Sequence, residues 1–137
     1  LKEWARVLKP GSFFGLFDVL RGSIAEPLSF PVPWAGKAED SFVASLDEMR
    51  RYLGEAGFEI LVEDDLSGFS LKSLARLQAA NPEFGPRLVI GNDYETKIAN
   101  LIANIETKRC APSLMICRKR STWENQTRDH KARDNRG

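Results

Sequence analysis

An almost unbroken apolar run at residues 13–19, FFGLFDV, constrains the fold of this chain more than any other stretch. It follows Lys9-Pro10-Gly11, which ends a preceding helix because proline lacks an amide hydrogen and glycine adopts backbone angles that other residues avoid. Such a run is typical of a strand buried on both faces, as in a parallel sheet. The sequence therefore predicts a strand that needs neighbouring strands and covering helices.

Helical and strand patterns alternate along the rest of the chain, which indicates an α/β fold with three strands. The strands are predicted at 13–19, 58–63 and 113–117, where apolar residues run together or alternate. The first helix has apolar residues at i, i+3, i+4 and i+7: Leu1, Trp4, Ala5 and Leu8. A long irregular segment at 20–44 separates the first strand from the next helix, and loops of that length are usually functional.

Start and stop signals delimit the other helices. Ser45 and Glu48 form a capping box at the start of one helix, which Gly57 is placed to end and whose apolar face is predicted to consist of Leu46, Met49, Leu53 and Ala56. Ser70 is predicted to begin a short helix that stops at Asn81-Pro82. A longer helix is predicted to begin after Asp93 and to carry an apolar face at Ile98, Leu101, Ile102 and Ile105.

The C-terminal segment differs from the rest of the 137 residues in composition. From Arg118 onward there are seven Lys or Arg and three Asp or Glu, a net charge of +4, whereas the remainder carries −3. Only Trp123 is strongly apolar there, so the segment cannot bury enough surface to offset its ordering entropy. We predict that 119–137 is a disordered, basic polar tail. Its interspersed acidic residues and modest charge argue against nucleic acid as a partner.

Cysteine and histidine usage excludes several kinds of site. Cys110 and Cys117 have no histidine nearby, which fits neither a metal site nor a disulfide framework, so we expect small buried apolar residues. His130 falls in the predicted tail and lacks a positioned partner for acid–base catalysis. No apolar stretch is long enough to cross a bilayer and no signal-peptide pattern opens the chain, so we expect a protein of the reducing cytoplasm.

Several stretches resemble class I S-adenosylmethionine-dependent methyltransferases, and most of all the group that acts on small molecules. They are E-x-x-R-V-L-K-P-G at 3–11, the strand that ends in Asp18, the loop FPVPWA at 30–35, and L-x-x-A-G-F at 53–58. In that family the first stretch leads into the fifth strand and the last leads into the sixth. The resemblance implies a partial Rossmann-like three-layer domain over 1–118. Its strands would be equivalent to five, six and seven, with a helical insertion at about 67–108.

The half of the family's fold that holds the cofactor has no counterpart in this sequence. That half uses a glycine-rich turn after the first strand and an acidic residue after the second, and no G-x-G occurs here. The resemblance links the chain to methyl transfer to a small acceptor, yet we expect no cofactor to bind the chain alone and no activity from it. Two alternatives are a non-catalytic module for ligand binding or interaction and the acceptor half of a split methyltransferase.

The resemblance marks six residues as candidates for the acceptor pocket: Asp18, Phe30, Trp34, Tyr94, Lys97 and Asn100. Asp18 ends the predicted strand, where open α/β sheets bind ligands, although an aspartate there also caps turns. Phe30 and Trp34 would form an apolar lid, or would pack as ordinary loop residues. The polar groups after Asp93, including Asn104, would face the acceptor or form a solvated helix face.

Strand 13–19 is also expected to present an open edge. If the fold begins at the family's fifth strand, this strand lacks a neighbour on one side, and its free backbone groups pair readily with another chain. We therefore expect a homodimer in which two copies of the strand pair antiparallel across a two-fold axis to give a six-stranded sheet. A separate chain that carries the glycine-rich half is the alternative partner.

Overall fold

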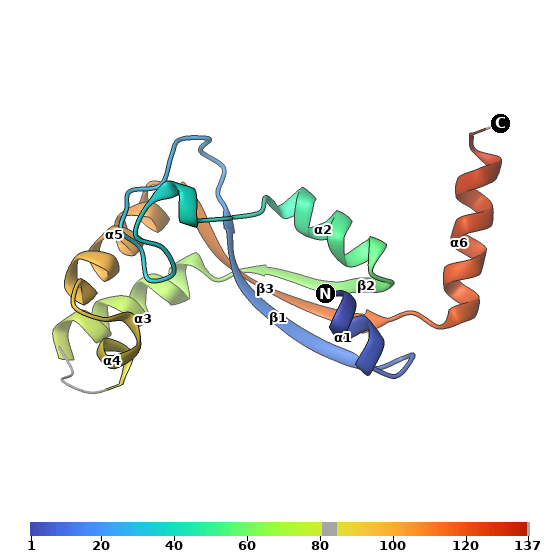
Figure 1. Cartoon of the computed structure of the whole chain (residues 1–137), viewed down its shortest axis with the longest axis horizontal. Coiled ribbons are helices and arrows are strands. Elements are labelled where there is room, and N and C mark those ends of the chain that lie inside the picture. Colours follow the sequence, from blue (N-terminus) through green and yellow to red (C-terminus); the bar gives the residue numbers. More distant parts are fainter. Residues whose placement is uncertain (81–84, 137) are drawn as a thin grey trace. The chain divides into compact units, whose positions relative to one another are not determined.

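The computed structural model describes residues 1–80 and 85–136 and has an α/β fold, as the sequence predicted (Figure 1). Its strands are β1 (Phe13–Arg21), β2 (Phe58–Asp65) and β3 (Cys110–Lys119). Its helices are α1 (Lys2–Val7), α2 (Leu46–Glu55), α3 (Ser67–Ala80), α4 (Pro86–Ile90), α5 (Tyr94–Glu106) and α6 (Thr122–Asp134), with a short 3-10 turn η1 at Ala38–Asp40. Each predicted strand is confirmed, a few residues longer than its apolar run.

The strand β3 is central in a three-stranded sheet of order β1-β3-β2. Backbone hydrogen bonds at the strand ends show that β3 runs antiparallel to both neighbours. These bonds are Gly11 N to Lys119 O (2.8 Å), Gly22 N to Arg109 O (2.9 Å), Arg120 N to Gly57 O (2.9 Å) and Leu66 N to Pro112 O (2.8 Å). The strand that comes last in the sequence therefore joins the other two.

The expectation that strand 13–19 is buried on both faces is wrong. Phe13 and Phe17 are 64% and 57% exposed. The other face is packed, and the ring of Phe14 meets that of Phe58 edge-to-face at 4.7 Å between centroids. Because β1 is an edge strand of an antiparallel sheet, one of its faces can remain uncovered although nearly all its residues are apolar.

The chain divides into two compact units. The first comprises Leu1–Phe17, Leu46–Asp64 and Leu114–Gly137, and the second comprises Asp18–Ser45 and Asp65–Ser113. In the first unit Met49 and Leu53, from the predicted apolar face of α2, are buried with Phe58. The predicted apolar face of α1 is not buried, since α1 has no buried residue and Trp4 packs edge-on against Phe14 while remaining half exposed.

The second unit holds the loop after β1 and the helices α3, α4 and α5, which lie within the expected helical insertion of about 67–108. The predicted helix start at Ser70 is wrong. The helix α3 begins at Ser67, whose backbone N–H donates to the Asp65 side chain at 2.8 Å. The predicted stop at Asn81-Pro82 lies outside the described residues.

Both cysteines are buried and free, as predicted. Burial raises the pKa of Cys110 to about 11, and burial together with the charge of Glu63 raises the pKa of Cys117. They are therefore neutral thiols near pH 7 and pack as small apolar residues. The described part of the chain contains no group of three or more His, Cys, Asp or Glu that could hold a metal ion. None of the helices in these residues combines the length and the hydrophobicity that a membrane span requires.

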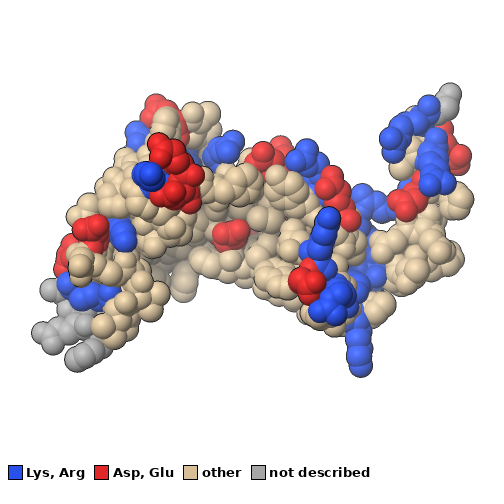
Figure 2. Space-filling model, in the orientation of Figure 1, with Lys and Arg blue, Asp and Glu red and all other residues tan. Residues whose placement is uncertain are grey.

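The C-terminal segment contains the helix α6, so the predicted disorder of 119–137 is wrong there. Ser121 Oγ accepts a hydrogen bond from Glu124 N at 3.2 Å, and the Glu124 carboxylate accepts one from Ser121 N at 2.7 Å. Arg118 bridges Glu124 (3.0 Å) and Glu59 of β2 (2.7 Å). The helix buries no residue, and Figure 2 shows charged side chains of both signs along it. The helix is thus stabilised by its cap and by ion pairs. The prediction of disorder considered only the number of apolar residues and did not include these interactions.

We expect Ser121→Ala to lower the helix content of the chain, because it removes the side chain that caps α6. Loss of such a cap costs about 1 kcal/mol, and no buried side chain offsets it. Circular dichroism measures the change. Thr127→Ala, within the same helix, is the control and should not lower helix content. Equal spectra for Ser121→Ala and the parent chain would contradict the capping assignment.

Candidate functional site

Two asparagines of α5 hold the loop that follows β1. Asn104 is 0% exposed; its Oδ1 accepts from Ser29 N at 2.8 Å and its Nδ2 donates to Ser29 O at 3.1 Å. One turn earlier, Asn100 Nδ2 donates to Pro31 O at 2.9 Å. These amides satisfy loop backbone groups that have no partner in a sheet or helix. The loop around residues 29–31 is therefore fixed against α5.

Lys97 also bonds to the protein's own backbone. Its Nζ donates to the carbonyl of Ile90, the last residue of α4, at 2.9 Å. A positive charge at that end of a helix is stabilising. Lys97 and Asn100, both expected in the acceptor pocket, thus organise neighbouring segments. The alternative of a solvated helix face is wrong for Asn104, which is buried.

The two aromatic candidates lie on a tight turn within the loop. Val32 and Ala35, which sequence analysis did not single out, are buried and exchange backbone hydrogen bonds of 2.8 and 3.1 Å. Trp34 lies between them, is exposed, and donates from Nε1 to Ser41 Oγ at 3.0 Å. Phe30 is half-buried. The spacing of Val32 and Ala35 has no regular period, so no sequence signal marked them as the base of the turn.

Tyr94, in the first turn of α5, is the candidate with a free polar group. Its side chain is 2% exposed, and its hydroxyl is buried without a hydrogen-bond partner among the described residues. It lines a cavity of about 300 Å³ together with Gln78 of α3 and Glu95 and Ile98 of α5. The Arg87 guanidinium lies 5.1 Å from the centre of its ring. A buried hydroxyl without a partner costs about 1–3 kcal/mol, so the contribution of Tyr94 to the cavity wall is made at the expense of an unpaired polar group.

Asp18 lies inside β1 and not at its end, because the strand continues to Arg21. The side chain is exposed, and its carboxylate accepts a hydrogen bond from Val19 N at 2.8 Å. No hydrogen bond or ion pair in the described part of the chain joins Asp18 to the other candidates. Phe30 and Trp34 thus lie in the loop that Asn100 of α5 bonds at Pro31, and Lys97 lies on the same helix. Asp18 instead contacts the backbone of the next residue, Val19.

Solved structures share this fold. A protein described as a sarcosine dimethylglycine methyltransferase from Galdieria sulphuraria matches with a TM-score of 0.62 and 16% identity, over 87% of this chain and 46% of its own. Geranyl diphosphate methyltransferase, solved with S-adenosylmethionine, matches with a TM-score of 0.61 and 11% identity, over 86% of this chain and 43% of its own. The 4+2 cyclase SpnF matches with a TM-score of 0.57 and 22% identity, over 87% of this chain and 43% of its own.

The chain spans less than half the length of each of these proteins. At such identities the likeness shows the fold alone, and that fold occurs in a cyclase as well as in methyltransferases. No model of a known protein family and no curated protein sequence matches the chain.

We expect different effects on stability from two substitutions in α5. Asn104→Ala leaves the N–H and C=O of Ser29 unpaired and should lower the free energy of unfolding by about 2 kcal/mol or more. Tyr94→Phe removes a hydroxyl without a partner and should leave stability unchanged or raise it by about 1 kcal/mol. Urea unfolding measures both. A loss of more than about 1 kcal/mol in Tyr94→Phe would show that the hydroxyl is bonded.

Proposed function

We propose that this chain forms the acceptor-binding part of a fold that transfers a methyl group from S-adenosylmethionine to a small acceptor. The observation that carries the proposal is the match to two methyltransferase structures over 87% and 86% of this chain but only 46% and 43% of theirs. The resemblance at 3–11 and 53–58 supports the same reading. The chain would contribute the acceptor side, and another segment would contribute the donor site.

Methyl transfer requires mainly that the methyl donor and the acceptor are held in the correct relative position. A lone pair on the acceptor forms a bond to the methyl carbon while the carbon–sulfur bond breaks, and the acceptor's proton passes to a base or to solvent. A cavity of about 300 Å³ is at the lower limit for small-molecule sites, so a compact acceptor is favoured. Within it the Gln78 amide can hydrogen-bond the acceptor, and the Tyr94 ring supplies an aromatic wall.

The donor site is proposed to come from a segment that pairs with β1. This strand is at the edge of the sheet, and Phe13 and Phe17 leave one of its faces apolar and exposed. A complementary segment with a glycine-rich turn would add strands at this edge and cover that face. A split methyltransferase would have this arrangement.

Calorimetric titration of the 137-residue chain with S-adenosylhomocysteine tests where the donor site lies. We expect no saturable heat and no rise in melting temperature, because the chain has no G-x-G turn to approach the ligand. The same titration on a methyltransferase with both halves is the positive control. Saturable binding would contradict the division of the two sites between segments.

A second candidate is a non-catalytic module that dimerises and binds a small ligand. The exposed edge of β1 favours it, because two copies can pair there across a two-fold axis. Light scattering should then give twice the chain mass of 15.4 kDa. Phe17→Lys should shift the chain to monomer, whereas Phe69→Lys, an exposed position on α3, should not. A monomeric parent chain would contradict the dimer and leave the complementary segment as the proposed partner of β1.

A further inference from the structure

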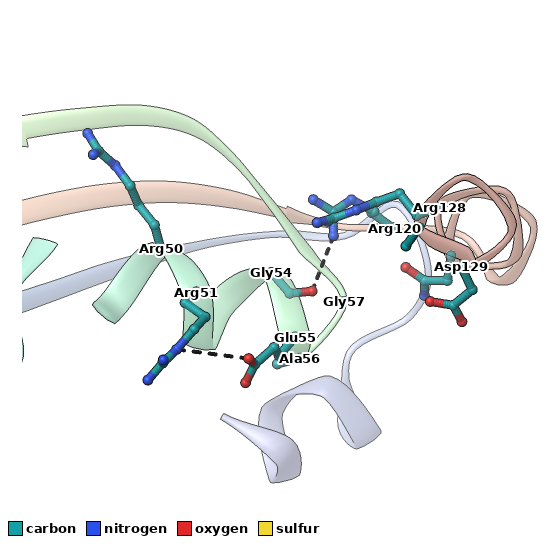
Figure 3. Close-up of a pocket in the computed structure, with 11 residues that line it drawn as sticks. Arg50, Arg51, Gly54, Glu55, Ala56, Gly57, Arg120, Arg128 and Asp129 are labelled. Carbon is teal, nitrogen blue, oxygen red and sulfur yellow. Dashed lines mark hydrogen bonds and ion pairs between the residues drawn. The ribbon is translucent and has the colours of Figure 1, made fainter. Parts of the chain in front are cut away.

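A second cavity lies in the first unit, between the C-terminal end of α2 and α6 (Figure 3). Its volume is about 710 Å³. Charged side chains dominate its lining: Arg50, Arg51, Glu55, Arg120, Arg128 and Asp129. Neither the fold nor the proposed acceptor site assigns a role to this cavity.

Two of the four arginines already have carboxylate partners. Arg50 donates to Glu63 at 2.6 Å and to Asp47 at 2.9 Å. Arg51 lies 3.9 Å from Glu55. Figure 3 shows the Arg50 and Arg51 side chains pointing away from the other two arginines. Their charges are therefore balanced locally.

Arg120 and Arg128 instead converge on Gly54 (Figure 3). Arg120 Nη1 lies 3.5 Å from Gly54 O, and the two Nη atoms of Arg128 lie 3.9 Å from the position that a Cβ on Gly54 would occupy. No ion pair joins either arginine to a carboxylate in the described ranges 1–80 and 85–136. Burial, and after it the positive charge of Arg128, lowers the pKa of Arg120. The two guanidinium groups thus lie beside Gly54 without a direct ion pair among the described residues, while Glu59 and Glu124 attract Arg120 from a longer range.

We propose that Arg120 and Arg128 bind the phosphate group of a small organic ligand in this cavity. An anion between the two side chains replaces their repulsion with two attractions. Each planar guanidinium can donate two parallel N–H bonds to adjacent oxygens. A phosphate has enough oxygens for two such pairs, whereas the two oxygens of a carboxylate suffice for one. Because the cavity is much larger than the ion and lies within the range of small-molecule sites, we expect a phosphate monoester.

Two further side chains bear on this site. The Asn125 amide nitrogen lies 3.4 Å from the Cβ position of Gly57 and adds a neutral donor to the wall of the cavity. Asp129 lines the same cavity and opposes a bound anion. Replacing Asp129 should therefore strengthen binding, an effect that a damaged fold would not produce.

Calorimetric titrations with inorganic phosphate and with phenyl phosphate, in buffer of constant ionic strength, test the proposal. Arg120→Gln and Arg128→Gln should each weaken binding about tenfold, because each removes charge-assisted hydrogen bonds. Asp129→Asn should tighten it. Arg133→Gln, on the same helix but outside the cavity lining, is the matched control and should change affinity less than about twofold. Phenyl phosphate should bind more tightly than phosphate if the remaining volume receives the organic group.

Several outcomes would overturn the proposal. One is the absence of saturable binding for both probes. Another is an equal loss of affinity in Arg128→Gln and Arg133→Gln, which would indicate the diffuse charge of α6. A third is binding of a single-stranded oligonucleotide that Arg120→Gln, Arg128→Gln and Arg133→Gln weaken equally, which would also indicate the diffuse charge of α6. Circular dichroism of each variant verifies that α6 is retained. A loss of phosphate affinity confined to Arg120→Gln and Arg128→Gln would then support the site.

Discussion

The antiparallel pairing of β3 with both β1 and β2 is the constraint on which the rest of the structure depends. Since β3 comes last among the strands and lies between the other two, the chain must return to the middle of the sheet after β2. The helices α3, α4 and α5 occupy the connection that makes this return possible. Phe14 and Phe58, one from each outer strand, meet edge-to-face and close the packed face of the sheet. Pairing and packing therefore specify the same strand order.

The two units depend on different interactions. In the first unit, apolar side chains from α2 and the sheet form the core, with Met49, Leu53 and Phe58 buried. In the second, the amide of Asn104 is buried and bonds both backbone groups of Ser29. A long loop leaves many backbone groups without regular partners, and side-chain amides can satisfy them. Polar helix residues that sequence analysis assigns to a ligand pocket, such as Asn100 and Asn104, can therefore instead hold a loop in place.

Arginines illustrate how the same residue type takes different roles. Arg118 is bonded to two glutamates and links the start of α6 to β2. Arg50 is bonded to Asp47 and Glu63. Arg120 and Arg128 come from the same basic segment but lie beside Gly54 without a direct ion pair to a carboxylate in the part of the chain that the structure describes. The electrostatic balance of each guanidinium follows from its neighbours in space, and this is what separates a structural arginine from a candidate ligand-binding one.

Local patterns in the sequence determined the α/β class, the three strands, the burial of Met49 and Leu53 in α2, and the buried state of both cysteines. These features follow from residue period, helix signals and side-chain hydrophobicity, which neighbours along the chain already express. The prediction of disorder after residue 118 could have been avoided, because Ser121 and Glu124 carry the spacing of a capping box.

Only the tertiary structure decided the exposure of β1, the partners of Lys97, Asn100 and Asn104, and the isolation of the Tyr94 hydroxyl. Asn104 and Ser29 are 75 residues apart in the chain. Whether a polar group is solvated, bonded or left without a partner depends on such distant contacts. An apolar run likewise gives the tendency of a strand to be covered, but strand order decides which of its faces is covered.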